Sequence, residues 1–144
     1  MATPHSGCAA VALDEHRIMV AGGYSVSEPV LTTTEVLDVR TMAFAPGPSM
    51  SSARTFCAAV PVDAQHVLII GGQDSVKALA TTELLDVAML EFSPGPTMQC
   101  SRSGSAAACL DAAGDGRRIL VLGGGGSTTE MLAVDAQTSA RHRR

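Results

Sequence analysis

The sequence repeats itself at a spacing of 48 residues, and this repeat constrains the fold more than any other feature. The segment Thr-Thr-Glu-Val-Leu-Asp-Val at 33–39 recurs at 81–87 with one change, and Pro-Gly-Pro-Ser-Met at 46–50 recurs at 94–98 as Pro-Gly-Pro-Thr-Met. A double glycine also recurs, as Gly22 and Gly23, Gly71 and Gly72, and Gly123 and Gly124. The 144 residues therefore divide into repeats at 1–53, 54–101 and 102–139, followed by a basic tail at 140–144.

Each repeat shows the same series of short apolar runs between turn-forming residues. In the first repeat the runs span 8–13, 18–21 and 35–39, and a fourth short run centres on Phe44 before Pro-Gly-Pro. The second repeat places Phe92 at the equivalent position. Runs of this length bounded by Gly, Pro and Asp indicate strands and turns, and no helical periodicity competes with them. The sequence predicts an all-β protein.

A unit of this length with four short antiparallel strands has the size of one propeller blade. The residues resemble the Kelch repeat, in which an apolar strand ends in Gly-Gly and an aromatic residue follows about twenty positions later. Gly22 and Gly23 with Phe44, and Gly71 and Gly72 with Phe92, fit that outline. The resemblance implies a partial Kelch-type β-propeller of three blades with up to four antiparallel strands each. The last blade is expected to be incomplete, because no aromatic residue follows its glycines.

Three blades are fewer than the four to eight of a closed propeller. We therefore expect one of two arrangements. Either two chains form a homodimer that closes a six-blade ring, or the chain lacks further blades of a longer propeller.

Charge and cysteine content exclude several classes of function. The net charge is −4, and three of the ten basic residues lie in the last four positions, so the remainder is more acidic still. An acidic surface argues against nucleic acid and anionic membranes as partners. The N-terminus lacks the pattern of a secretory signal, which makes the cytoplasm the expected location. The four cysteines form no CxxC pair, so neither a zinc site nor a redox motif is indicated.

No catalytic or metal-binding constellation is found, and no cofactor is expected. The glycine-rich run at 119–128 lacks the residues of a dinucleotide fingerprint or a phosphate-binding loop. The acidic residues at 35, 38, 83 and 86 recur once per repeat, which favours structural hydrogen bonds over an acid–base pair. Arg54 and Arg102 are expected to bond to carbonyl or carboxylate groups between blades, although they could also line a central channel.

The loops differ most between repeats at one edge of the predicted sheets, and variable loops on a repeated scaffold are where recognition is built. The predicted partner-binding residues are Tyr24, Glu28, Arg54, Gln73, Asp74, Lys77, Gln99 and Arg102. The resemblance implies a non-catalytic protein–protein interaction module, for example a substrate receptor of a ubiquitin ligase. The alternatives are a mutarotase-like propeller enzyme acting on a small sugar with Arg and Glu, or a truncated propeller without independent function.

Overall fold

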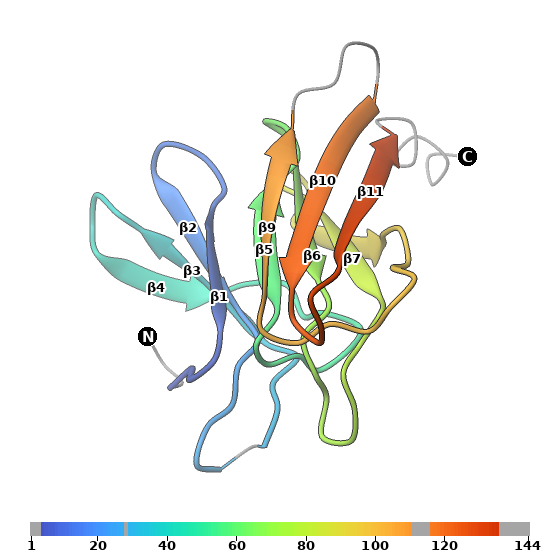
Figure 1. The fold of residues 1–144 in the computed structure, drawn as a ribbon. Helices are drawn as coiled ribbons and strands as arrows, with labels where there is room; N and C mark the ends of the chain where they lie inside the picture. The colour runs from blue at the N-terminus through green and yellow to red at the C-terminus, as the bar shows by residue number, and fades with distance from the viewer. Residues whose placement is uncertain (1–3, 28, 111–115, 136–144) are drawn as a thin grey trace.

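The computed structural model describes residues 4–27, 29–110 and 116–135 (Figure 1). This part of the chain is all-β and forms three antiparallel sheets. None of it is a helix long and apolar enough to cross a membrane. Glu28, the end of the third repeat at 136–139 and the basic tail at 140–144 lie outside the described residues.

Each sheet follows the order of the sequence. Sheet I comprises β1 (Ala9–Ala12), β2 (Arg17–Ala21), β3 (Thr34–Asp38) and β4 (Ala43–Pro46). Sheet II comprises β5 (Ala58–Pro61), β6 (His66–Ile70), β7 (Thr82–Asp86) and β8 (Glu91–Pro94). Sheet III comprises β9 (Ser105–Leu110), β10 (Gly116–Gly123) and β11 (Thr129–Asp135). The predicted all-β class and the antiparallel pairing within each repeat are confirmed, and the described third sheet has three strands.

Strand pairing is the same in the three sheets. Val20 of β2 pairs with Glu35 of β3, and Ile69 of β6 pairs with Glu83 of β7. In sheet III, Val121 of β10 pairs with Glu130 of β11. The repeated acidic residue therefore occupies one structural position in all three sheets.

The sheets stack face to face, with sheet II in the middle (Figure 1). One apolar cluster joins sheet I to sheet II and includes Met19, Val67 and Ile69. A second joins the other face of sheet II to sheet III and includes Leu68 and Ile119. All five residues of β6 are buried, because the strand is covered on both faces.

The segments before the first strands of the three sheets also run next to one another. The backbone N–H of Phe56 donates to the carbonyl of Gly7 at 2.7 Å, and that of Gly104 donates to the carbonyl of Phe56 at 2.8 Å. These three residues are equivalent positions of the three repeats, so the bonds link successive sheets in register.

Candidate functional site

The three sheets have two distinct edges. The connections that follow β2, β6 and β10, together with the segments that enter β1, β5 and β9, share one edge because the strands are antiparallel. We call this the loop edge; in Figure 1 it is at the bottom of the molecule. The turns between β1 and β2 and between β3 and β4 lie at the opposite edge.

Arg54 lies at the junction of sheets I and II, and its side chain is fully buried. Its Nε donates to Oε1 of Glu83 at 3.1 Å, and its Nη1 donates to the carbonyls of Gly71 at 2.7 Å and Thr81 at 2.9 Å. The Glu83 carboxylate also accepts the backbone N–H groups of two residues that follow sheet I, Ser51 and Ser52.

The backbone of Arg54 forms hydrogen bonds with sheet I. Its carbonyl accepts the N–H of Gly23 at 2.7 Å, and its N–H donates to the carbonyl of Leu31 at 3.0 Å. Arg54 therefore binds sheet I with its main chain and sheet II with its side chain. These contacts agree with the predicted role of Arg54, which was to bond to carbonyl or carboxylate groups between successive repeats.

Arg102 repeats the arrangement between sheets II and III. Its Nη1 donates to the carbonyls of Gly123 at 2.6 Å and Thr128 at 2.9 Å. Its Nε lies 3.5 Å from Oε2 of Glu130, beyond the separation of the equivalent pair in sheet II.

His5 occupies the arginine position of the first repeat. Its Nδ1 lies 2.6 Å from the carbonyl of Gly22, which is the carbonyl equivalent to Gly71, and its Nε2 lies 3.6 Å from Oε1 of Glu35. The three repeats thus share one kind of polar contact beneath the loop edge, with histidine replacing arginine once.

Burial corrects one part of the predicted binding surface. Arg54 and Arg102 were expected to flank a recognition surface, but their side chains are buried against internal carbonyl and carboxylate oxygens. Charge-assisted bonds of this kind satisfy the guanidinium within the fold. The two arginines therefore position the loops and do not present a charge to a partner or to a sugar.

The other predicted residues that are described lie at or near the surface. Tyr24, Lys77 and Gln99 are exposed, and Gln73 and Asp74 are partly exposed. The Asp74 carboxylate accepts the N–H groups of Lys77 and Val76, and these bonds hold its pKa below the ordinary value. Asp74 therefore stays ionised and fixes the turn of its loop.

Phe56 is the residue at the loop edge that the sequence analysis did not select. The residue is 44% exposed, and the centroid of its ring lies 6.1 Å from that of Tyr24, at an interplanar angle of 50°. Its backbone has φ of 54°, in the left-handed region, where the equivalent residues Gly7 and Gly104 have φ of 65° and 72°. A bulky residue in this conformation is uncommon, and such strain gathers at functional sites. The sequence feature that could have identified Phe56 is an aromatic residue at a position that is glycine in the other two repeats.

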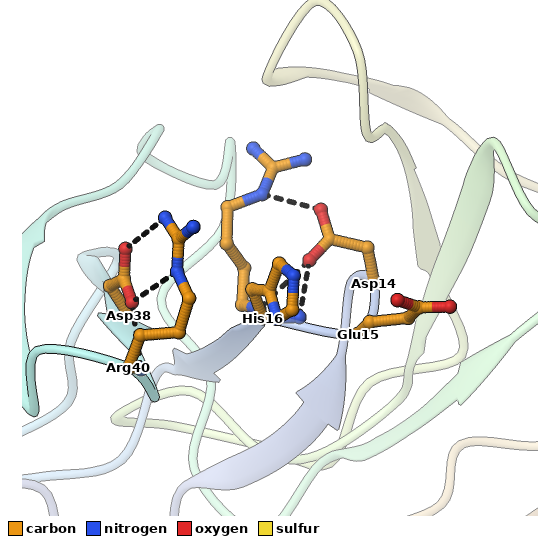
Figure 2. A pocket seen from close by; sticks show the side chains of 6 residues that line it. Asp14, Glu15, His16, Asp38 and Arg40 are labelled. Carbon is orange, nitrogen blue, oxygen red and sulfur yellow. Dashed lines mark hydrogen bonds and ion pairs between the residues drawn. The ribbon is translucent and has the colours of Figure 1, made fainter.

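The opposite edge carries a hollow of about 350 Å³ on sheet I (Figure 2). Four of its charged groups form two ion pairs, in which Arg17 Nε lies 2.7 Å from Asp14 and Arg40 Nη2 lies 3.2 Å from Asp38. Both aspartates also accept backbone N–H groups of their own turns. These contacts support the structural interpretation of the repeated carboxylates. Glu15 and His16 also line the hollow and are exposed.

The described residues of the two edges form no metal centre. Across 4–27, 29–110 and 116–135, no three His, Cys, Asp or Glu side chains lie close enough to hold a metal ion. All four cysteines are free thiols.

Fold and contacts together define an all-β protein of three successive antiparallel sheets, joined through one repeated polar contact and two apolar interfaces. No protein-family model matches the chain, and no curated protein is similar enough to show a relationship.

Proposed function

We propose that this protein is a non-catalytic protein–protein interaction module of the cytoplasm, built on three blades of a Kelch-type β-propeller. The Kelch resemblance rests on the double glycines and on the aromatic residues Phe44 and Phe92. It is supported by the repeated strand order and by successive sheets that stack face to face.

The observation that carries the binding proposal is the aromatic pair of Tyr24 and Phe56 on the loop edge. Tyr24 and Phe56 are 41% and 44% exposed. Phe56 also has a strained backbone conformation, whereas the two equivalent residues are glycines. Replacing the phenylalanine by glycine would relieve that strain, so the ring serves a purpose other than stability. Aromatic residues are the commonest anchors of protein–protein interfaces.

The surroundings of the pair favour a protein partner. Val26 and Val76, in the loops after β2 and β6, are also exposed at this edge. Asp74 and Lys77 add a carboxylate and an ammonium group of opposite charge. Apolar anchors with a polar rim are typical of protein interfaces, whereas a small-molecule site is usually an enclosed pocket.

The test is affinity capture with the 144-residue chain and with the variant Phe56→Gly. Glycine removes the ring and suits the positive φ, so the fold is retained. We expect the variant to lose the partners that the wild-type chain retains, and Asp74→Lys with Lys77→Glu to weaken the same set.

Met42→Gly is the matched control. Met42 is an exposed apolar residue with φ of 55°, but it lies in the turn between β3 and β4 at the opposite edge. Partners retained equally by wild type, Phe56→Gly and the charge-reversed variant would refute the proposed surface.

A further inference from the structure

Sheet III exposes an apolar outer face. Strand pairing places Leu110, Leu120, Leu122 and Met131 in adjacent rows on the side away from sheet II. Leu110, Leu122 and Met131 are among the exposed large apolar residues of the described chain. Ala106, Ala108 and Ala133 lie on the same face, and so do two exposed polar residues at its ends, Thr129 beside Leu122 and Arg118 between Leu110 and Ala133. We call these residues the sheet III outer face.

Most of these positions are buried in the other two sheets. Among the apolar positions, the exceptions are Val36, the equivalent of Met131, and the two aspartates equivalent to Ala133, Asp38 and Asp86, which are only partly buried. Leu122 is 41% exposed, whereas its equivalents Ile70 of sheet II and Ala21 of sheet I are each 0% exposed. Leu120 corresponds in the same way to the buried residues Leu68 and Met19. Sheets I and II bury this face against the sheet that follows them. The sheet III outer face therefore has a composition like that of a buried interface, but no further sheet of the described chain covers it.

Sheet I has the complementary uncovered face. Ala10, Ala12, Ile18, Val20 and Leu37 lie on the side away from sheet II and are exposed or partly exposed. The equivalent residues of sheets II and III pack against the sheet that precedes them. These include Val67, Ile69 and Leu85 in sheet II, and Ile119, Val121 and Leu132 in sheet III.

The first glycine of each double glycine also indicates that sheet III lacks a following sheet. A Cβ on Gly22 would clash with the Arg54 carbonyl oxygen, and one on Gly71 would lie 2.5 Å from that of Arg102. Gly123 keeps the same positive φ, at 71°, but a Cβ there would meet nothing within 4 Å. Gly123 thus keeps the positive φ of the other two glycines, although no neighbouring backbone of the described chain lies close enough to exclude a Cβ there.

We propose that a second copy of this chain docks head to tail, with its sheet I outer face on the sheet III outer face of the first. The occupant is another copy because the chain already contains two interfaces of this kind, between sheets I and II and between sheets II and III. The new junction would be the third of the series, and it is independent of the partner-binding function proposed above.

The existing junctions specify the contacts of the new one. The N–H of Gly23 donates to the Arg54 carbonyl at 2.7 Å, and that of Gly72 donates to the Arg102 carbonyl at 2.8 Å. The equivalent bond would run from Gly124 to the carbonyl of His5 in the second copy. Cys109 Sγ lies 3.5 Å from the carbonyl oxygen of Val62, so Ala12 of the second copy would lie against Leu110.

Two copies can make this junction twice, which leaves neither apolar face uncovered. A head-to-tail contact forms a closed ring when its rotation closes, and a dimer of this type has a twofold axis. The structure thus points to a ring of two chains, each contributing three sheets.

Size-exclusion chromatography with light scattering tests the proposal on the 144-residue chain. We expect a mass twice the 14.7 kDa of one chain. Met131→Glu places a charge in the sheet III outer face, and Ala12→Glu places one in the sheet I outer face. Both residues are exposed in the single chain, so both variants should fold and elute with the mass of one chain.

Mixing the two variants distinguishes the head-to-tail arrangement from other dimers. The Ala12→Glu chain keeps its sheet III face and the Met131→Glu chain keeps its sheet I face, so the mixture can form one intact junction. We expect the mixture to regain a dimer that neither variant forms alone. Met89→Glu and Ala88→Glu, in the exposed turn between β7 and β8, are the controls and should remain dimeric.

Three results would overturn the proposal. The first is a wild-type chain that stays monomeric across the accessible concentrations. Another is a dimer that neither face variant disrupts. The third is a dimer lost with Met131→Glu and retained with Ala12→Glu, which would indicate contact between two sheet III faces.

Discussion

The guanidinium of Arg54 and the carboxylate of Glu83 form a buried ion pair, with Nε and Oε1 3.1 Å apart, where sheet I meets sheet II. Two backbone N–H groups from the end of sheet I bind the same carboxylate. The pair therefore connects three separate segments. Removing one partner would leave the other charge buried and uncompensated.

Arg54→Met should lower the free energy of unfolding by about 3–5 kcal/mol, because Glu83 loses its counter-ion in a buried site. Arg102→Met should cost less, about 1–3 kcal/mol, because the Nε of Arg102 makes no hydrogen bond to Glu130 at 3.5 Å. Urea unfolding followed by circular dichroism measures both. The exposed Arg40→Met is the control, and equal losses for Arg54 and Arg40 would contradict the buried pair.

Gly71→Ala should destabilise the protein more than Gly123→Ala. Both glycines have positive φ, which costs an alanine about 1–2 kcal/mol. At Gly71 the new Cβ would also lie 2.5 Å from the Arg102 carbonyl oxygen, and forcing the backbone apart adds roughly 1–3 kcal/mol. Thermal and urea unfolding at a protein concentration low enough to favour single chains compares them. A larger loss at Gly123 would contradict the described spacing of the sheets.

Asp14 should contribute to stability in a pH-dependent way. The N–H of His16 and the guanidinium of Arg17 hold its pKa below the ordinary value of 3.8. Since the folded value is the lower one, the contribution is complete above pH 3.8 and is lost as the pH falls through the folded pKa. Asp14→Asn should therefore reduce the loss of stability on acidification.

Urea midpoints at about pH 6 and about pH 2.5, on either side of the ordinary aspartate pKa, measure the effect. Glu15→Gln removes a neighbouring exposed charge and is the control. An unchanged acid dependence in Asp14→Asn would show that these hydrogen bonds do not form in solution.

Cys57 and Cys100 should differ in reactivity. Burial raises the pKa of the Cys57 thiol to about 11, whereas Cys100 is exposed. Because the thiolate is the reactive form, a disulfide reagent near neutral pH should modify Cys100 in the native protein and Cys57 only after unfolding. Peptide mass mapping after timed reaction assigns the sites. Modification of Cys57 as fast as Cys100 would contradict its burial.

Local pattern in the sequence was sufficient to predict the strands and their order. The repeat at a spacing of 48 residues located equivalent positions, and Gly, Pro and Asp marked the turns, because these signals depend on backbone geometry over a few residues. The structural interpretation of Asp38 and Asp86 follows from the same local signals, since each accepts N–H groups of the turn that follows it.

Tertiary structure decided which side chains reach the surface. The sequence predicted that Arg54 and Arg102 bond between successive repeats and also placed them among the partner-binding residues. The stacking of successive sheets buries their side chains, which leaves only the first of these roles. Phe56 shows the opposite outcome. An apolar residue next to a strand is expected to be internal, but Phe56 is exposed beside Tyr24.

The same distinction holds for the two outer faces. Leu122 and Ile70 occupy equivalent positions of two repeats, and the strand pattern assigns them the same side of a sheet. One is buried and the other exposed, because burial depends on whether another sheet lies against that side. The sequence by itself determined the repeated sheet, and the stacking of the sheets alone decided which of its faces remain available to a second molecule.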